Sequence, residues 1–524
     1  MRILWSSVSP FIGSGYGSQT NIATRKLREL GHDVAILCHA GITGAKTEWG
    51  DIPLYPNNYP GNYGTAAAPA TYHDFNADLL ITLVDIWVMG QMDPTLNWCP
   101  WMPIDHNPIP PLVLKTAQQC PGIIKPIAMS KFGMKQLEDK GVDSYYIPHT
   151  VNTKLFKADT VSRARGRDRY DWGEDTFVIG CVATNQAERK NWNVMMQAVA
   201  KFEKMHPGKV VFYMHTRLED SMGLNLRELK EHLGMNEYVR APSVTQMEIG
   251  IPENIMAATY NVFDVFLLPS KGEGFGIPYI EAQATGVPVI MTKCTGHEEL
   301  MGGGWFIENL RKEWSGQGSW RFDCDVDEVV EKLELAYQAK KSGEIVEIGK
   351  KAVAKAMEYE EEYIYSTYWP SVLADIEKKL KEPRNMEGVQ KWRLAFVPQS
   401  IVPRKVLDLG CGLTIPYKPY LAHLGDYVAV DNRANGTNGI IKADAHKLPF
   451  RDNEFGFLWC SEMLEHCDKP EVVVREAKRV SKHGVIMFST PKNGAFFLDP
   501  GHKTVDPRKV AYSEMGTGDG ILIW

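Results

Sequence analysis

Lys271-Gly-Glu-Gly-Phe-Gly-Ile-Pro-Tyr-Ile-Glu-Ala-Gln-Ala-Thr-Gly-Val-Pro-Val-Ile290 is the most informative stretch of this chain. A glycine-rich turn carries Glu273, and the helix predicted after it holds Glu281 about two turns from its start. Gly286 ends this helix, and the apolar run at 287–292 is typical of a buried strand. Loop, helix and strand in this order bring both carboxylates to the carboxyl edge of a parallel sheet, where such folds bind ligands.

The two carboxylates suit a sugar or ribose, because one carboxylate accepts hydrogen bonds from two hydroxyls at once. Their spacing resembles the Glu-x7-Glu signature of retaining glycosyltransferases with the GT-B fold. The resemblance implies that Glu281 binds the ribose of a nucleotide-sugar donor and that Glu273 orients the sugar. The glycine turn would let backbone amides approach the ligand, namely those of Gly274, Phe275 and Gly276. The alternative is an N-capped amphipathic helix with an acidic first turn.

Composition places the chain among soluble globular proteins. It has 524 residues, of which 44% are hydrophobic and 23% charged, and this length predicts about three domains. The net charge of -6 and the lack of a long basic run argue against a dedicated nucleic-acid surface, although a local basic groove stays open. No apolar run approaches the ~20 residues of a membrane span, so any membrane contact is expected to be peripheral.

The cysteines and the first residues predict a cytoplasmic protein. The nine cysteines form no Cys-x2-Cys pair and lie mostly in apolar contexts, which indicates free thiols and no structural zinc. Met1 leads directly into a strand, which leaves no room for a signal peptide.

Strands alternate with helices in two successive blocks, the pattern of doubly wound parallel sheets. A polar stretch at 159–175 separates them. The predicted fold class is therefore α/β, with two tandem Rossmann-like lobes in the GT-B arrangement and a small Rossmann-like domain after them. The predicted ranges are an acceptor-side N-lobe at 1–158, a donor-side C-lobe at 172–352, a helix at 353–381, a linker at 382–400 and a third domain at 401–524.

The helix predicted at 353–381 is acidic and aromatic, and Pro370 should kink it or end its first half. In the resembling enzymes a terminal helix crosses back onto the N-lobe, where these aromatic side chains would pack. The alternative is an aromatic face that binds a partner.

Two segments are expected at the donor diphosphate. Arg189 and Lys190 lie in a loop after the first strand of the second block. Asn185, in the same loop, stands where many relatives place an arginine and is a further donor-binding candidate. Positive charge is needed there because negative charge develops on the leaving diphosphate. Lys190 would act as a point charge, and the guanidinium of Arg189 would replace that of the arginine found in relatives. The alternative is that both side chains are merely solvated. Gly15 and Gly17 precede the first predicted helix, and their amides would meet the diphosphate from the N-lobe.

The proline-rich loop at 101–111 matches the region where relatives carry a histidine that contacts the transferred sugar. His106 is the candidate, with Asp105 as an acceptor-side carboxylate, and a structural role for His106 is the alternative. The stretch 146–156 resembles the end of the family's N-lobe, although Thr150 stands where relatives have glycine.

No metal site is expected, since relatives with this fold do not require one. The Asp-x-Asp stretch Asp323-Cys-Asp325 precedes a predicted helix at 326–336 and is interpreted as its cap. The family retains the anomeric configuration by a same-face route in which the leaving phosphate helps to deprotonate the acceptor.

The third block begins with a buried strand and a glycine turn at 405–412, followed by a strand that ends in Asp431. This is the spacing of a nucleoside-binding unit. With the segments 442–450 and 461–467, the block resembles class I S-adenosylmethionine-dependent methyltransferases over roughly 401–500. An NAD-binding domain is the alternative. The cofactor-binding residues implied are Asp408, Gly410, Gly412, Asp431, Asp444 and Glu462.

About 120 residues are few for such a domain, and Phe455-Gly456 departs from the family's Phe-Asp. His466 and His502 are candidate proton acceptors for methylation of an oxygen, with a structural role for each as the alternative.

Together these motifs predict a bifunctional sugar-modifying enzyme. It would transfer a sugar, with retention, from a UDP- or GDP-sugar to a glycan or other hydroxyl acceptor, and methylate an oxygen with S-adenosylmethionine. The alternatives are a glycosyltransferase of modified DNA or of a protein surface, and a non-catalytic binding role for the third domain. The nucleotide, sugar, acceptor and oligomeric state stay open.

Overall fold

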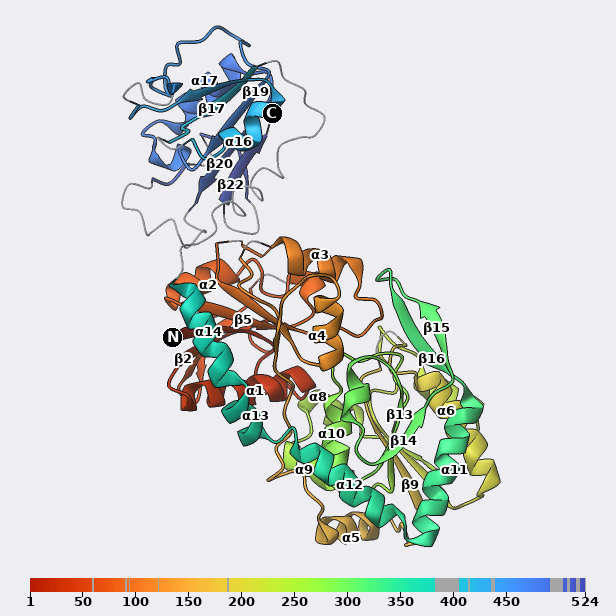
Figure 1. Cartoon of the computed structure of the whole chain (residues 1–524). Helices are drawn as coiled ribbons and strands as arrows, with labels where there is room; N and C mark the ends of the chain where they lie inside the picture. The colour runs from red at the N-terminus through yellow and green to blue at the C-terminus, as the bar shows by residue number, and fades with distance from the viewer. Residues whose placement is uncertain are drawn as a thin grey trace.

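The computed structural model of the chain contains three α/β parts, each built on its own sheet (Figure 1). It describes residues 1–58, 61–89, 92–93, 95–120, 122–185, 188–381, 405–412, 415–434, 439–490, 503–506, 509–514 and 519–523. The predicted linker and His502 lie outside these ranges. No helix within them is both long and apolar enough to cross a membrane.

The N-lobe is an eight-stranded sheet in the order β3-β4-β2-β1-β5-β6-β7-β8, parallel except for the β3–β4 pair. The central strands are buried on both faces, which explains their continuous apolar sequence. The strands are β1 (Arg2–Ser7), β2 (Asp33–Cys38), β3 (Thr47–Trp49), β4 (Ile52–Pro56), β5 (Leu79–Leu83), β6 (Trp98–Met102), β7 (Ile127–Ala128) and β8 (Tyr145–Tyr146). The helices are α1 (Gly15–Glu29), α2 (Ala68–Asp74), α3 (Pro111–Gln119) and α4 (Lys131–Glu138).

The C-lobe is a six-stranded, fully parallel sheet in the order β11-β10-β9-β12-β13-β14. Its strands are β9 (Phe177–Val182), β10 (Val210–His215), β11 (Val239–Arg240), β12 (Val265–Leu268), β13 (Val289–Thr292) and β14 (Gly304–Ile307). Its helices are α5 (Thr160–Arg169), α6 (Trp192–Met205), α7 (Leu226–His232), α8 (Val244–Ile249), α9 (Glu253–Asn261), α10 (Ile277–Ala284), α11 (Val326–Ser342) and α12 (Ile345–Met357).

Helix α5 occupies the polar stretch that was predicted to separate the lobes. Its Arg163 and Arg167 donate to the two carboxylate oxygens of Asp264, at 2.5 and 2.6 Å, and Lys340 adds a third cation at 3.0 Å. Asp264 is buried, so these charges tie α5 firmly to the C-lobe.

An antiparallel hairpin, β15 (Leu310–Trp314) and β16 (Trp320–Cys324), follows β14 and was not predicted. It extends from the C-lobe beside α3 of the N-lobe (Figure 1). Asn107 N donates to Trp320 O at 3.1 Å, and Ser319 Oγ donates to Pro108 O. The hairpin therefore reaches the N-lobe loop that carries the predicted sugar-contacting histidine.

The helix predicted at 353–381 is interrupted twice; the break at Pro370 was expected, and the break near Tyr359 was not. The chain forms α12, α13 (Glu361–Thr367) and α14 (Trp369–Leu380) instead. The first break arises where Val151 N donates to Tyr359 O at 2.9 Å, so the backbone pairs with the N-lobe rather than continuing the helix. The second break falls before Pro370, which lies in the first turn of α14, where a missing N–H costs no helical bond.

Helices α13 and α14 pack against the N-lobe. The Trp369 ring meets Trp101 edge-on at 5.6 Å between centroids, and Tyr145 Oη donates to Asp375 at 2.6 Å. Lys26 Nζ donates to Glu362 at 2.6 Å. The chain therefore crosses back from the C-lobe to the N-lobe.

The C-terminal part is a six-stranded sheet in the order β18-β17-β19-β20-β22-β21, in which the first four strands are parallel and β22 is antiparallel to its neighbours. The strands are β17 (Lys405–Leu409), β18 (Asp426–Val430), β19 (Phe457–Ser461), β20 (Gly484–Ser489), β21 (Ser513–Glu514) and β22 (Asp519–Ile523). The helices are α16 (Lys418–Leu421) and α17 (Pro470–Val480). The predicted fold class, two Rossmann-like lobes followed by a small Rossmann-like domain, is confirmed.

Candidate active site

A buried ion cluster lies where the loops that follow β9 and β12 meet. Glu273 is 5% exposed, and its Oε2 accepts a hydrogen bond from Arg189 Nη1 at 2.5 Å. Its Oε1 accepts from Lys190 Nζ at 2.5 Å and from Ser270 Oγ at 2.6 Å. The backbone N–H of Glu273 donates to Thr295 Oγ1 at 2.9 Å. The structure therefore brings together one carboxylate and both cations of the predicted site.

The charges in this cluster depend on one another. Burial alone disfavours the ionised form of Glu273, but Arg189 and Lys190 overcome it and hold the pKa of the carboxyl well below its usual range. Burial lowers the pKa of Lys190, although Glu273 opposes this. Removing the carboxylate would therefore leave two poorly solvated cations side by side.

Asp105 and His106 join the cluster from the N-lobe. His106 Nδ1 and Asp105 Oδ1 are 2.6 Å apart, and Arg189 Nε lies 3.8 Å from Asp105 Oδ2. His106 is fully buried, and its Nε2 has no hydrogen-bond partner among the described residues. Burial opposes ionisation of Asp105, but His106 and Arg189 lower the pKa of its carboxyl. The five residues predicted as catalytic thus form one continuous network.

Asp85 was missed in the sequence. It follows β5, and burial raises the pKa of its carboxyl to about 6, with the nearby Asp105 adding to the effect. Partial burial raises the pKa of the Tyr16 hydroxyl on α1, and both acids add to the effect. The available signal was an acid two residues after a buried strand, at the sheet edge where ligands bind.

The glycines of the turn at 272–276 serve the contact between the lobes. A Cβ at Gly272 would lie 2.1 Å from the carbonyl oxygen of Asp105, and one at Gly274 would lie 2.2 Å from Pro103 Cβ. Gly276 has φ +115° and precedes α10. The Phe275 side chain is buried against the rings of His149 and Tyr359. Glycine is therefore required at 272 and 274 because the opposite lobe is so close.

Gly15 and Gly17 lie inside the first turn of α1, which begins earlier than predicted and is capped by Ser14. A Cβ at Gly17 would lie 2.0 Å from Ile12 O, and one at Gly15 would lie 3.2 Å from Ile277 Cδ1 of the C-lobe. The N-terminus of α1 therefore faces the C-lobe, as a role at the interlobe site requires.

Asn185 and Glu281 are bonded elsewhere. Asn185 Nδ2 donates to the carbonyls of Arg217 and Leu224, and its Oδ1 accepts from Leu224 N. Glu281 lies just over one turn into α10, not two, and its Oε2 accepts from Tyr260 Oη at 2.7 Å. No ion pair links Glu281 to the cation cluster in the described part of the chain.

Burial raises the pKa of Glu281 to about 7, so we predict a pH-dependent effect of Glu281→Gln on stability. Between an unfolded value near 4.5 and the folded value, the folded protein holds a proton that the unfolded chain releases. The contribution of the Glu281 carboxyl to wild-type stability is therefore fully present below pH 4.5 and is lost as the pH rises toward 7. Glutamine does not titrate, so the variant does not lose stability in this way. Its Tm relative to wild type should increase from pH 5 to 7.5 in scanning calorimetry. Glu248→Gln, at an exposed position of α8, is the control, and parallel curves for the two variants would contradict the prediction.

The Asp-x-Asp residues have protein partners. Asp325 caps α11 by accepting from Asp327 N at 2.8 Å, which confirms its predicted role, although α11 extends to Ser342. Asp323 accepts from Asn191 at 2.9 Å and from Arg311 at 3.1 Å. The described residues contain no group of acids, histidines and cysteines placed to hold a metal ion.

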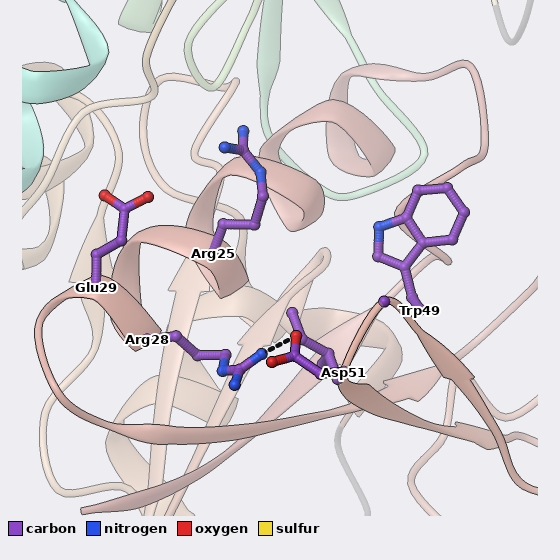
Figure 2. Close-up of a pocket in the computed structure, with 7 residues that line it drawn as sticks. Arg25, Arg28, Glu29, Trp49 and Asp51 are labelled. Atoms are coloured by element: carbon purple, nitrogen blue, oxygen red, sulfur yellow. Dashed lines mark hydrogen bonds and ion pairs between the residues drawn. The ribbon is translucent and has the colours of Figure 1, made fainter.

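A separate hollow of about 540 Å³ lies between the C-terminal half of α1 and the β3–β4 hairpin (Figure 2). Arg28 and Asp51 form an ion pair across it, and Arg25 and Trp49 line it. It begins ten residues along α1 from Gly15, about 15 Å away. It contains none of the predicted site residues.

The C-terminal part holds a second group of acids at the carboxyl ends of neighbouring parallel strands. Asp431 follows β18 and accepts from Gly412 N at 3.0 Å and from Arg433 N at 2.9 Å. Burial opposes its ionisation, but Arg433 lowers the pKa of its carboxyl. Asp408, within β17, accepts from Tyr427 Oη, and burial raises the pKa of its carboxyl to about 7.

The other predicted cofactor residues flank this group. Gly410 has φ +73°, and a Cβ there would lie 2.7 Å from Met463 Cγ. Glu462 directly follows β19, with φ +55°. Asp444 is exposed and accepts from both the backbone and the ring of His446. Gly410 and Glu462 therefore lie at the carboxyl ends of β17 and β19, whereas Asp444 lies in an exposed loop.

Comparisons with known families match two separate segments. Residues 176–315 match the family of glycosyl transferases group 1, and residues 407–489 match a methyltransferase domain.

Two curated relatives match parts of the chain. A GDP-mannose-dependent alpha-(1-6)-phosphatidylinositol monomannoside mannosyltransferase of Mycolicibacterium smegmatis is 28% identical over 169 residues, which are 30% of this chain and 40% of that protein. A D-inositol 3-phosphate glycosyltransferase of Corynebacterium urealyticum is 33% identical over 123 residues, 23% of this chain and 27% of that protein. This chain therefore spans 40% or less of the length of these relatives.

Solved structures resemble the two lobes together. The sucrose-phosphate synthase of Thermosynechococcus elongatus superimposes with a TM-score of 0.57 at 15% identity, covering 72% of this chain and all of that one. The Anabaena protein Alr3699/HepE in complex with UDP and glucose gives 0.53 at 16% identity, covering 71% of this chain and all of that one. These likenesses confirm the GT-B fold.

Proposed function

We propose that this chain, whose residues 176–315 match the group 1 glycosyl transferases and whose residues 407–489 match a methyltransferase domain, is a bifunctional sugar-modifying enzyme. Its first activity would be retaining transfer of a sugar from a UDP- or GDP-sugar to a hydroxyl acceptor. The mannosyltransferase relative is GDP-mannose-dependent, and the HepE structure holds UDP and glucose, which supports both nucleotides as candidates.

The buried Arg189–Glu273–Lys190 cluster is the observation that carries this proposal. Both cations donate to Glu273 at 2.5 Å, within a site that is largely shielded from water. Preorganised cations stabilise charge that develops on a leaving diphosphate, and shielding strengthens the effect. Arg189 and Lys190 would therefore supply the positive charge that a metal ion supplies in other transferases.

The N-lobe would contribute from the opposite side. The N-terminus of the 15-residue α1 presents backbone amides and the positive end of the helix dipole, which favour a phosphate. Asp105 would fix the orientation of His106, whose Nε2 has no partner among the described residues and would face the transferred sugar. Glu273 would orient the sugar hydroxyls, and Glu281 would accept from the donor ribose.

The second proposed activity is methylation of an oxygen on the glycan product or acceptor. The glycine turn after β17 and the acids after β18 and β19 fit S-adenosylmethionine, which supplies the methyl group when bound. Asp431 would accept from the ribose hydroxyls, replacing part of its bonding to Arg433. Asp444 would meet the adenine edge, while Asp408 and Glu462 would line the site. Joining two activities in one chain raises the effective concentration of one product at the next site.

Thermal-shift measurements on the full chain test both halves separately. A ligand at a hundred times its Kd stabilises the folded state by about 2.7 kcal/mol. UDP or GDP should therefore raise the melting temperature of the two lobes, and S-adenosylhomocysteine that of the C-terminal part. If neither nucleotide shifts the transition, the glycosyltransferase proposal is overturned.

Methyl transfer has its own test. Labelled methyl from S-adenosylmethionine should appear in the glycosylated product. Cofactor binding without transfer would instead indicate a non-catalytic binding domain. For a modified-DNA acceptor, affinity should fall steeply with added salt.

A further inference from the structure

The β15–β16 hairpin places one arginine between the two lobes at the candidate site. Arg321 lies between two anchored residues of β16, because Trp320 O accepts from Asn107 N at 3.1 Å and Phe322 N donates to Lys271 O at 2.8 Å. The first bond holds the loop of Asp105 and His106, and the second holds the loop of Glu273. The backbone on either side of residue 321 is therefore bonded to both loops that carry the ion cluster.

The Arg321 side chain points opposite to those of its two strand neighbours, since side chains alternate along a strand. Its Nε is buried, and no described residue accepts a hydrogen bond from it. Asp105, Glu273 and the cross-strand neighbour Glu313 attract the guanidinium electrostatically, while Arg189 repels it.

Those carboxylates are already engaged. Glu273 accepts from Arg189 and Lys190, and Asp105 is bonded to His106. Glu313 accepts from Lys271 at 2.5 Å. A buried guanidinium donor without an acceptor is costly, and a bound anion would satisfy it.

We propose that Arg321 is a third cation of the site and binds a phosphate oxygen of a substrate held between the lobes. This inference rests on the glycosyl transfer proposed above, and it assigns the hairpin a role in substrate binding. The phosphate could belong to the donor diphosphate or to a phosphorylated acceptor, and the planar guanidinium fork suits either one.

Calorimetric titration of the full chain with UDP and GDP tests the inference. Wild type is compared with Arg321→Gln, Arg321→Lys and the matched control Arg311→Gln, which removes an exposed guanidinium from the same hairpin. If the donor supplies the phosphate, Arg321→Gln should raise the Kd of the nucleoside diphosphate by about ten- to a hundred-fold. Binding of the matching nucleoside should not change, Arg321→Lys should recover part of the loss, and Arg311→Gln should bind as wild type.

A second titration separates the two sources. If the acceptor supplies the phosphate, Arg321→Gln should bind the nucleoside diphosphate normally, while the protein saturated with it should lose affinity for inorganic phosphate. Unchanged affinity in both titrations would overturn the inference. Failure of wild type to bind either nucleoside diphosphate would instead overturn the proposed glycosyltransferase function.

Discussion

Glu273→Gln should lower kcat for sugar transfer by about a hundred- to a thousand-fold, the scale seen when a preorganised charge-stabilising group is removed. The carboxylate accepts from Arg189 and Lys190 together, so its loss disturbs the position of both cations and of the sugar. The two half-buried cations would also lose their buried counter-charge, which costs up to about 3–5 kcal/mol of stability for a fully buried pair. Initial-rate measurements well below the Tm of the variant check the effect on kcat.

Two comparisons separate catalysis from misfolding. Ser270→Ala removes one hydrogen bond from an uncharged donor to the same carboxylate, leaves both cations in place, and should lower kcat by about ten-fold or less. Glu273→Gln itself should still bind UDP or GDP at least as tightly as wild type, because Arg189 and Lys190 no longer share their charge with a carboxylate. Normal kcat in a variant that binds nucleotide would contradict the role proposed for Glu273.

Asp431→Asn should raise the Kd of S-adenosylhomocysteine by about ten- to a hundred-fold, as expected for losing a charged acceptor of ligand hydroxyls. Asparagine keeps the size of the side chain and an oxygen that can accept from Gly412 N. Isothermal titration of the full chain measures the change. Asp426→Asn, at the exposed start of the same strand, is the control and should bind as wild type. Equal affinity of the two variants would mean that Asp431 does not hold the ribose.

The sheets could be predicted because their strands are nearly continuous apolar runs separated by turn residues. The hairpin β15–β16 could not, because it is held by contacts that are remote in sequence, such as Asn107 N to Trp320 O. The break at Tyr359 has the same origin, since the hydrogen bond with Val151 replaces the next helical turn. Local sequence in both places is compatible with other structures.

Those site residues that belong to a recognisable sequence motif could be predicted. Glu273 and the Arg189–Lys190 pair are brought into one cluster, but their spacing does not reveal that they form ion pairs with each other. Asp85 and Arg321 were missed because each is a single charged residue without a motif around it. Roles of individual residues in donor and cofactor binding stay predictions.

The two places where the chain passes between the lobes lie side by side, joined by the bond from Val151 N to Tyr359 O. The β15–β16 hairpin touches the N-lobe on the other side of the molecule (Figure 1). Two adjacent covalent connections resist sliding of the lobes. Any relative movement is therefore confined to rotation about these two connections, as in a hinge. Such a rotation would break the Asn107–Trp320 bond first, and would carry Arg321 away from Asp105 before Glu273 lost either of its cations.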